Sequence, residues 1–278
     1  MILNILNNIL SLLCGVFTIV YYFINNSSSA ALNILKGIGL GLAALVASYL
    51  VIFIIIWLFF ISVSFFIRPN KDYDKPSKVF NAIFILWYSY ITNFFRVKIR
   101  VTGLEKVPFG TRFLAIANHR SNLDNMIQAL VLKKEQIAYI SKPENFKIPI
   151  GGRFMKRGLY LSMPRGNTRE EFKTVMKAIE YLKDDKVSIG IFPEGTRSKD
   201  GKLREFKPGA FKIAEKAQCP IVVVSTKGTF DIHKNWPWKK THVYMDILDV
   251  IEPTVWSEKN TVEVSQYAHN LILNNLNK

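Results

Sequence analysis

The N-terminal part of the chain is almost free of charge, and this feature constrains the fold more than any other. Lys36 is the only charged side chain before Arg68, and the stretch from Gly37 to Ile67 carries none. A helix needs about 20 apolar residues to span the hydrocarbon core of a bilayer. We therefore expect a membrane helix in this stretch, tilted or with one end in the interface because the stretch is longer than one span requires.

A second apolar segment, Ile2 to Ile24, precedes it. This segment lacks the basic start and the small-residue cleavage site of a signal peptide, so we expect it to remain in the mature chain. The polar run Asn25 to Ser29 predicts the turn of a helical hairpin. No strand precedes the spaced glycines that begin at Gly37, so close helix packing through Gly37 and Gly41 is favoured over a nucleotide-binding loop.

The rest of the chain is strongly basic. Residues 68–278 carry 36 of the 37 basic and all 21 acidic side chains, which is a net charge of +15. Such a charge suits nucleic acid, an anionic membrane surface or anionic substrates. No zinc-finger, helix-turn-helix or aromatic RNA-binding pattern is present, so nucleic acid is disfavoured as a partner. Basic residues directly after the second apolar segment place that end in the cytoplasm: Arg68, Lys71, Lys75 and Lys78.

From Arg96 onward, strand and helix patterns alternate, which predicts an α/β domain with a sheet flanked by helices. The preceding segment, Val79 to Phe95, mixes apolar, aromatic and polar residues and suits equally an amphipathic interfacial helix or a core-packing helix. We expect a membrane anchor over 1–67, an amphipathic interfacial linker helix over 68–96 and the α/β domain over 97–278. The expected strands are Val97–Val101, Phe113–Ala117, Ile137–Ile140, Val187–Phe192, Ile221–Ser225 and Val243–Val250, and the expected helices are Leu123–Lys133, Glu170–Lys183, Gly209–Ala217 and Glu258–Leu276.

One short motif, Asn118 to Asp124, follows the expected strand Phe113–Ala117 and pairs a histidine with a carboxylate. Positions five apart differ by about 140° on a continuous helix, so His119 and Asp124 meet only if His119 lies in the loop and Asp124 in the first helical turn. Ser121 and Asp124 also form a capping-box pattern, in which Asp124 binds a backbone N–H at the helix start. The two roles for Asp124 are compatible, and both remain open.

A second motif, Phe192 to Ser198, follows the expected strand Val187–Phe192. Gly195 permits a tight turn and a close approach of the backbone to an anion. Arg197 offers the planar fork that matches a phosphate, and Glu194 is expected to orient Arg197 or another cation. The alternative is a plain loop with a surface arginine.

The two motifs in this order resemble those of the glycerolipid acyltransferase family, most of all the bacterial lysophosphatidic acid acyltransferases, over residues 102–250. The resemblance implies a glycerol-phosphate acyltransferase-like α/β fold with a mixed sheet. It implies that His119 is the general base and Asp124 its orienting carboxylate. It also places the loop of Glu194, Gly195, Thr196 and Arg197 at the glycerol phosphate.

Two further cations match family positions. Arg165, in the segment Gly158 to Asn167, matches a phosphate-binding arginine, and Lys142 resembles a lysine near the phosphate. Pro164 stands where the family usually has an Asp, which leaves the substrate preference open.

The implied reaction moves an acyl chain from acyl-coenzyme A or acyl-carrier protein to the free hydroxyl of lysophosphatidic acid, giving phosphatidic acid. The alternatives are another lysophospholipid or glycerol phosphate as acceptor, or a membrane lipid-binding protein without turnover. The thioester is a co-substrate, so no bound cofactor is expected, and no histidine pair has metal-ligand spacing. The expected partners are these substrates, membrane lipids and acyl-carrier protein, with the catalytic domain on the cytoplasmic face of the membrane.

Two other features of the sequence bear on the surroundings of the protein. Cys14 and Cys219 lie in separate apolar runs, which indicates two reduced thiols in a reducing compartment. Trp236 to Lys240 joins amphipathic rings to cations, a pattern that suits a lipid headgroup layer or, equally, a packed surface loop.

Overall fold

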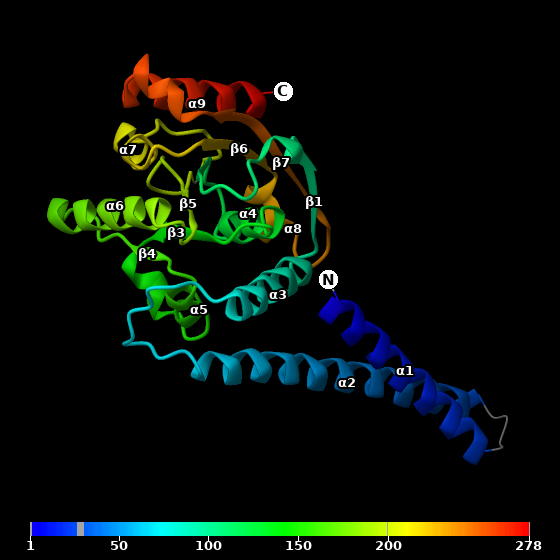
Figure 1. Ribbon diagram of the computed structural model, residues 1–278. Coiled ribbons are helices and arrows are strands. Elements are labelled where there is room, and N and C mark those ends of the chain that lie inside the picture. Colours follow the sequence, from blue (N-terminus) through cyan, green and yellow to red (C-terminus); the bar gives the residue numbers. More distant parts are fainter. Residues whose placement is uncertain (1, 27–30, 199, 278) are drawn as a thin grey trace. The chain divides into compact units, whose positions relative to one another are not determined.

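The computed structural model describes residues 2–26, 31–198 and 200–277. The chain divides into two compact units, one ending at Phe66 and one beginning at Ile67. The first unit is a pair of long helices, α1 (Ile2–Asn25) and α2 (Ala31–Phe65), drawn in blue in Figure 1. Helix α2 begins earlier than expected because Lys36, a good helix former, does not interrupt it. The predicted turn falls largely on residues 27–30, which lie outside the described residues.

Small residues let the two helices of the first unit approach closely. Gly37 and Gly41 are buried in α2, and Gly15 is buried in α1. A Cβ atom added to Gly15 would lie 3.0 Å from the carbonyl oxygen of Gly41, and one added to Gly41 would overlap the side chain of Ile19. The predicted packing role of Gly37 and Gly41 is confirmed, and the matching glycine of α1 was not foreseen.

Both helices are long and apolar enough to cross a membrane by length and composition, and little of either is buried. Their outward side chains are large and apolar, for example Leu13 at 59%, Phe17 at 70% and Leu42 at 59% exposure. A continuous apolar surface of this extent is unusual on a protein surrounded by water. The first unit therefore suggests membrane association.

The second unit is an α/β domain whose helices and strands alternate as the sequence predicts. Its elements in chain order are α3 (Lys78–Phe94), β1 (Val97–Thr102), β2 (Leu114–Ala117), α4 (Asp124–Val131), β3 (Ile137–Ser141), α5 (Gly151–Arg157), β4 (Leu161–Ser162), α6 (Thr168–Lys183), β5 (Ser188–Ile191), α7 (Lys212–Ala217), β6 (Ile221–Lys227), α8 (Ile232–Asn235), β7 (Thr241–Ile251) and α9 (Thr261–Leu276).

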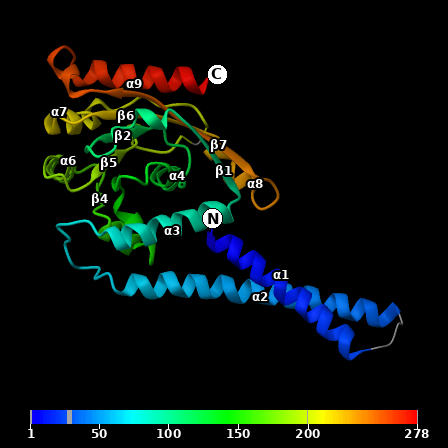
Figure 2. The same cartoon turned by 45° about the vertical axis from the view of Figure 1, so that its right-hand side comes forward.

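The strands form one mixed sheet in the order β1-β7-β6-β2-β5-β3-β4. Neighbouring strands are parallel except β6 and β7, which are antiparallel. Helices α6, α7 and α9 cover one face, and α3 and α4 pack together on the other (Figures 1 and 2). The predicted fold class, a mixed sheet flanked by helices, is confirmed.

Helix α3 belongs to the second unit and packs against α4 and α5. Trp87, Tyr88 and Tyr90 are buried, so these rings are core residues rather than interfacial anchors. The structure therefore favours the core-packing alternative for this helix. Two short helices, α5 and α8, were not predicted because neither is long enough to show a clear apolar period.

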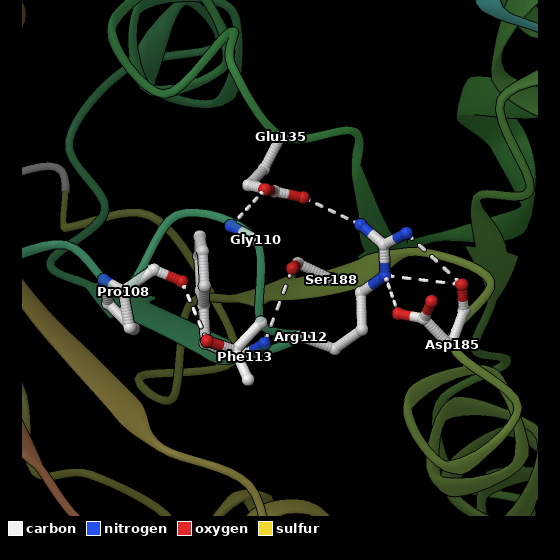
Figure 3. Close-up of polar contacts among 8 residues, drawn as sticks. Pro108, Gly110, Arg112, Phe113, Glu135, Asp185 and Ser188 are labelled. Carbon is white, nitrogen blue, oxygen red and sulfur yellow. Dashed lines mark hydrogen bonds and ion pairs between the residues drawn. The ribbon is translucent and has the colours of Figure 1, made fainter.

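The end of the sheet where β2, β3 and β5 begin is fastened by one arginine (Figure 3). The Arg112 guanidinium lies 2.6 Å from the Glu135 carboxylate and 2.8 Å from the Asp185 carboxylate. The Ser188 hydroxyl also accepts the N–H of Phe113 at 3.2 Å. These contacts hold the starts of three strands together and so fix the register of the strands that carry the candidate site at their other ends.

Candidate active site

The candidate residues gather at one edge of the sheet because the strands that precede them are parallel. His119 follows β2, Lys142 follows β3, Arg165 follows β4 and Glu194 follows β5. Strands β2, β3, β4 and β5 all run in one direction, so these residues share the carboxyl edge of the sheet. This is the edge at which open α/β sheets hold their ligands.

His119 and Asp124 are in direct contact. The Nδ1 atom of His119 lies 2.8 Å from Oδ2 of Asp124, with His119 in the loop after β2 and Asp124 in the first turn of α4. The side chain of Asp124 is 2% exposed and that of His119 is 21% exposed. With Nδ1–H donated to Asp124, neutral His119 keeps its free lone pair on Nε2, the nitrogen that can take up a proton.

Asp124 also makes one of the two interactions of the predicted capping box, because its carboxylate accepts backbone N–H groups at the start of α4. Its Oδ2 atom accepts the backbone N–H of Ser121 at 2.7 Å and that of Arg120 at 2.6 Å. The reciprocal half differs from the prediction, since the Ser121 hydroxyl accepts the N–H of Leu123 at 3.2 Å. The helix-start role and the pairing with His119 therefore exist together on one oxygen atom.

Glu194 fixes the backbone of His119 instead of orienting Arg197. Its Oε1 atom accepts the N–H of His119 at 2.6 Å, and its Oε2 atom accepts the N–H of Arg204 at 3.0 Å. In the described residues Glu194 forms no ion pair with Arg197, and its two oxygens instead bind backbone amides. Burial raises the pKa of the Glu194 carboxyl, and the two N–H donors partly oppose that rise.

The second motif also binds the backbone carbonyl of His119. Ser198 donates its N–H to the carbonyl of His119 at 2.9 Å. Gly195 has a φ of 72°, the left-handed conformation that favours glycine, so the predicted tight turn is present. The two motifs are thus joined through the main chain on both sides of His119.

An aromatic stack that was not predicted from the sequence supports the imidazole ring. The rings of His119 and Phe192 are 4.2 Å apart at an angle of 14°, and Tyr139 continues the stack beyond Phe192. A Cβ atom on Gly190 would overlap the Tyr139 ring, so this glycine in β5 provides the space for it. Phe192 lies directly before Pro193 and Glu194 in the second motif, and this position could have indicated that its ring lies near His119.

In the described part of the chain, the side chains of the remaining candidates form no hydrogen bond or ion pair with this group. Lys142, Arg165, Thr196 and Arg197 are exposed in loops at the same edge of the sheet. Exposed cations beside a buried acid–base pair can receive an anionic group of a substrate. Cys219 is buried, which raises the pKa of its thiol to about 12 and leaves it unreactive.

The sequence of the chain is similar to those of known acyltransferases. The sequence model of the Acyltransferase family matches residues 98–227. The chain is 34% identical over 158 residues to the chloroplastic 1-acyl-sn-glycerol-3-phosphate acyltransferase LPAT1 of Arabidopsis thaliana, covering 56% of this chain and 44% of the relative. It is 26% identical over 200 residues to the 1-acyl-sn-glycerol-3-phosphate acyltransferase of Haemophilus influenzae, covering 72% of this chain and 82% of the relative.

A solved structure shares the fold. The crystal structure of the 1-acyl-sn-glycerophosphate (LPA) acyltransferase PlsC from Thermotoga maritima matches with a TM-score of 0.57 at 24% identity, covering 79% of this chain and 94% of that one. The chain spans less than half the length of the matched plant relatives from Brassica napus and Arabidopsis thaliana. The resemblance predicted from the two motifs is confirmed: residues 98–227 match the Acyltransferase family, and the relatives reported above are 1-acyl-sn-glycerol-3-phosphate acyltransferases.

Proposed function

We propose that the protein transfers an acyl chain from an acyl thioester to the free hydroxyl of lysophosphatidic acid, giving phosphatidic acid. The observation that carries the proposal is the 2.8 Å contact between His119 and the buried carboxylate of Asp124, at an edge lined by exposed cations. The names of the relatives, which are 1-acyl-sn-glycerol-3-phosphate acyltransferases, support the same substrate.

In this proposal His119 acts as the general base. Its Nε2 atom takes the proton of the acceptor hydroxyl as the hydroxyl oxygen attacks the thioester carbonyl. The Asp124 carboxylate holds the ring in the required tautomer and stabilises the imidazolium that forms. When the tetrahedral intermediate collapses, the C–S bond breaks, and the imidazolium returns the proton to the leaving thiolate.

The oxyanion of that intermediate needs donors other than the amides next to His119. The N–H of His119 is already donated to Glu194, and those of Arg120 and Ser121 are donated to Asp124. These three groups form the rigid support of the base. We assign the acceptor phosphate to Arg197, Arg165 and Lys142, with Gly195 and Thr196 allowing the loop to approach it.

We further propose that residues 1–67 anchor the protein, and that residues 97–278, with α3 packed against them, form the catalytic domain on the cytoplasmic face; the rest of 68–96 connects the two. The basic residues after α2 support this orientation. Cysteine labelling in intact cells tests it, with Asn26→Cys and Lys259→Cys reporters in a background without Cys14 and Cys219. Labelling of Lys259→Cys by an impermeant reagent would contradict the orientation.

An acyl-transfer assay tests the function itself. Purified full-length protein is given lysophosphatidic acid, other lysophospholipids or glycerol phosphate, each with acyl-coenzyme A and with acyl-carrier protein as donor. We expect phosphatidic acid as the main product, with at least one donor. Faster turnover of another acceptor would reassign the substrate, and saturable lysolipid binding without turnover with either donor would indicate a lipid-binding protein.

A further inference from the structure

The loop between α8 and β7 carries an exposed tryptophan flanked by lysines. Trp238 is 84% exposed, and Lys239 and Lys240 beside it are also exposed. The amphipathic indole prefers the boundary between lipid and water, and the neighbouring cations suit anionic headgroups.

The base of this loop is held firmly, so the exposure of Trp238 is a property of a fixed conformation. Trp236 packs on Phe94 and Phe95 and donates its indole N–H to the carbonyl of Phe94 at 2.9 Å. Arg96 donates to the carbonyls of Pro237 at 2.8 Å and Trp238 at 3.3 Å. The two tryptophans therefore differ in role, with one ring fastening the loop and the other presented outward.

The strands beside the loop extend the cationic surface. Lys98 pairs with His242 and Arg100 pairs with Tyr244 in the register of β1 and β7, and all four side chains are exposed on one face. The Arg100 guanidinium lies over the Tyr244 ring at 5.8 Å from its centroid. In the sequence, Asp231 is the only acidic residue within 94–101 and 227–245. We call the exposed side chains of Trp238, Lys239, Lys240, Lys98, Arg100, His242 and Tyr244 the cationic-aromatic face.

The topology of the sheet places this face at the same edge as the candidate site. Strand β6 is parallel to β2, and β7 is antiparallel to β6, so the start of β7 lies beside the end of β6. Asn118, next to His119, exchanges hydrogen bonds of 2.9 and 2.8 Å with the backbone of Thr226 near the end of β6. The loop that carries Trp238 connects these strand ends.

We propose that the cationic-aromatic face docks the second unit onto the anionic headgroup layer of a bilayer, with the Trp238 ring inserted among the headgroups. Charge complementarity and the exposed indole favour this partner, because the amphipathic ring prefers the headgroup layer and the cations suit anionic lipids. Docking presents the carboxyl edge of the sheet to the membrane. This orientation would let a lysolipid reach His119 from the bilayer. Only that role in lysolipid access rests on the proposed function; the docking itself does not.

A solvent-sensitive fluorophore on the full-length protein tests the docking. The label is attached at Trp238→Cys, or at the exposed control position Lys259→Cys near the opposite edge, after replacement of Cys14 and Cys219. The protein is reconstituted into vesicles of phosphatidylcholine alone or mixed with phosphatidylglycerol. We expect a blue shift, and quenching by brominated lipids, at position 238 in the anionic vesicles and an aqueous spectrum at position 259 in both.

The lysines supply the charge dependence. Replacing Lys239 or Lys240 by Gln should lower the ratio of docked to undocked label about fivefold each, because one cation near an anionic surface contributes about that factor. An aqueous label at position 238 in both vesicles would overturn the proposal. Shielding of position 238 only after addition of acyl-carrier protein would overturn it in favour of a protein partner.

The same variants separate docking from catalysis. Trp238→Ala should reduce kcat/KM for lysophosphatidic acid held in vesicles and leave it unchanged for a short-chain, water-dispersed acceptor. Equal loss on both acceptors would show that the ring supports the fold instead of docking. The fluorescence result does not depend on turnover, so docking can hold even if the proposed reaction fails.

Discussion

Oδ2 of Asp124 lies 2.8 Å from Nδ1 of His119, and the same oxygen also accepts the N–H groups of Arg120 and Ser121. One buried atom thus orients the imidazole and closes the start of α4. A change that removes this oxygen alters the orientation of the base and the stability of the helix start together. The two roles are therefore separated by comparing Asp124→Asn, which keeps an oxygen, with Asp124→Ala, which removes it.

We expect Asp124→Asn to lower kcat by about 10⁴ with only a modest loss of stability. The asparagine oxygen can still accept the two N–H groups, but a neutral amide does not stabilise the imidazolium. Asp124→Ala should lose the rate and, in addition, about 1–3 kcal/mol of stability, because the N–H groups lose their acceptor. Steady-state rates and melting curves of both variants provide the test. Near-normal turnover of Asp124→Asn with a lower melting temperature would leave only the helix-start role.

Gly190→Ala should shift the His119 ring indirectly, through Tyr139 and Phe192. The added methyl group overlaps the Tyr139 ring, which must shift against Phe192 and so against the imidazole. Overpacking of this kind costs about 1–3 kcal/mol, and we expect a lower melting temperature together with a lower kcat. Gly209→Ala is the matched control, because a Cβ atom there meets nothing within 4 Å. Equal rates for the two variants would show that the stack does not position the base.

Arg197→Lys should weaken the use of the acceptor more than that of the thioester. Lysine keeps the charge but loses the fork that binds a phosphate through two N–H groups. Loss of one charge-assisted hydrogen bond costs about 1.5–3 kcal/mol, so the acceptor KM should rise about tenfold or more. Initial rates at varied concentrations of each substrate measure the effect. An unchanged acceptor KM would move the phosphate to Arg165 or Lys142.

The sequence predicted the parts of this protein that depend on periodicity and spacing. The alternation of strands and helices predicted the α/β unit. The loop position of His119 followed from the angle between positions five apart on a helix. The glycines of α2 were assigned correctly to helix packing because no strand precedes them.

Other features depend on contacts between distant segments, which spacing does not encode. Glu194 was expected to face a cation, yet its partners are the backbone amides of His119, 75 residues away, and of Arg204, ten residues away. The aromatic composition of α3 suited both an interface and a core. Only packing against α4 and α5 decides between them, and it buries Trp87 and Tyr88.

The most direct test of the central claim is the rate of phosphatidic acid formation by purified wild-type protein and by His119→Ala. Removal of a general base lowers the rate by about 10²–10⁴. We predict a loss of at least this size, with lysophosphatidic acid binding and the melting temperature nearly unchanged, since Asp124 and Glu194 keep their backbone partners. Near-normal phosphatidic acid formation by His119→Ala would contradict the account.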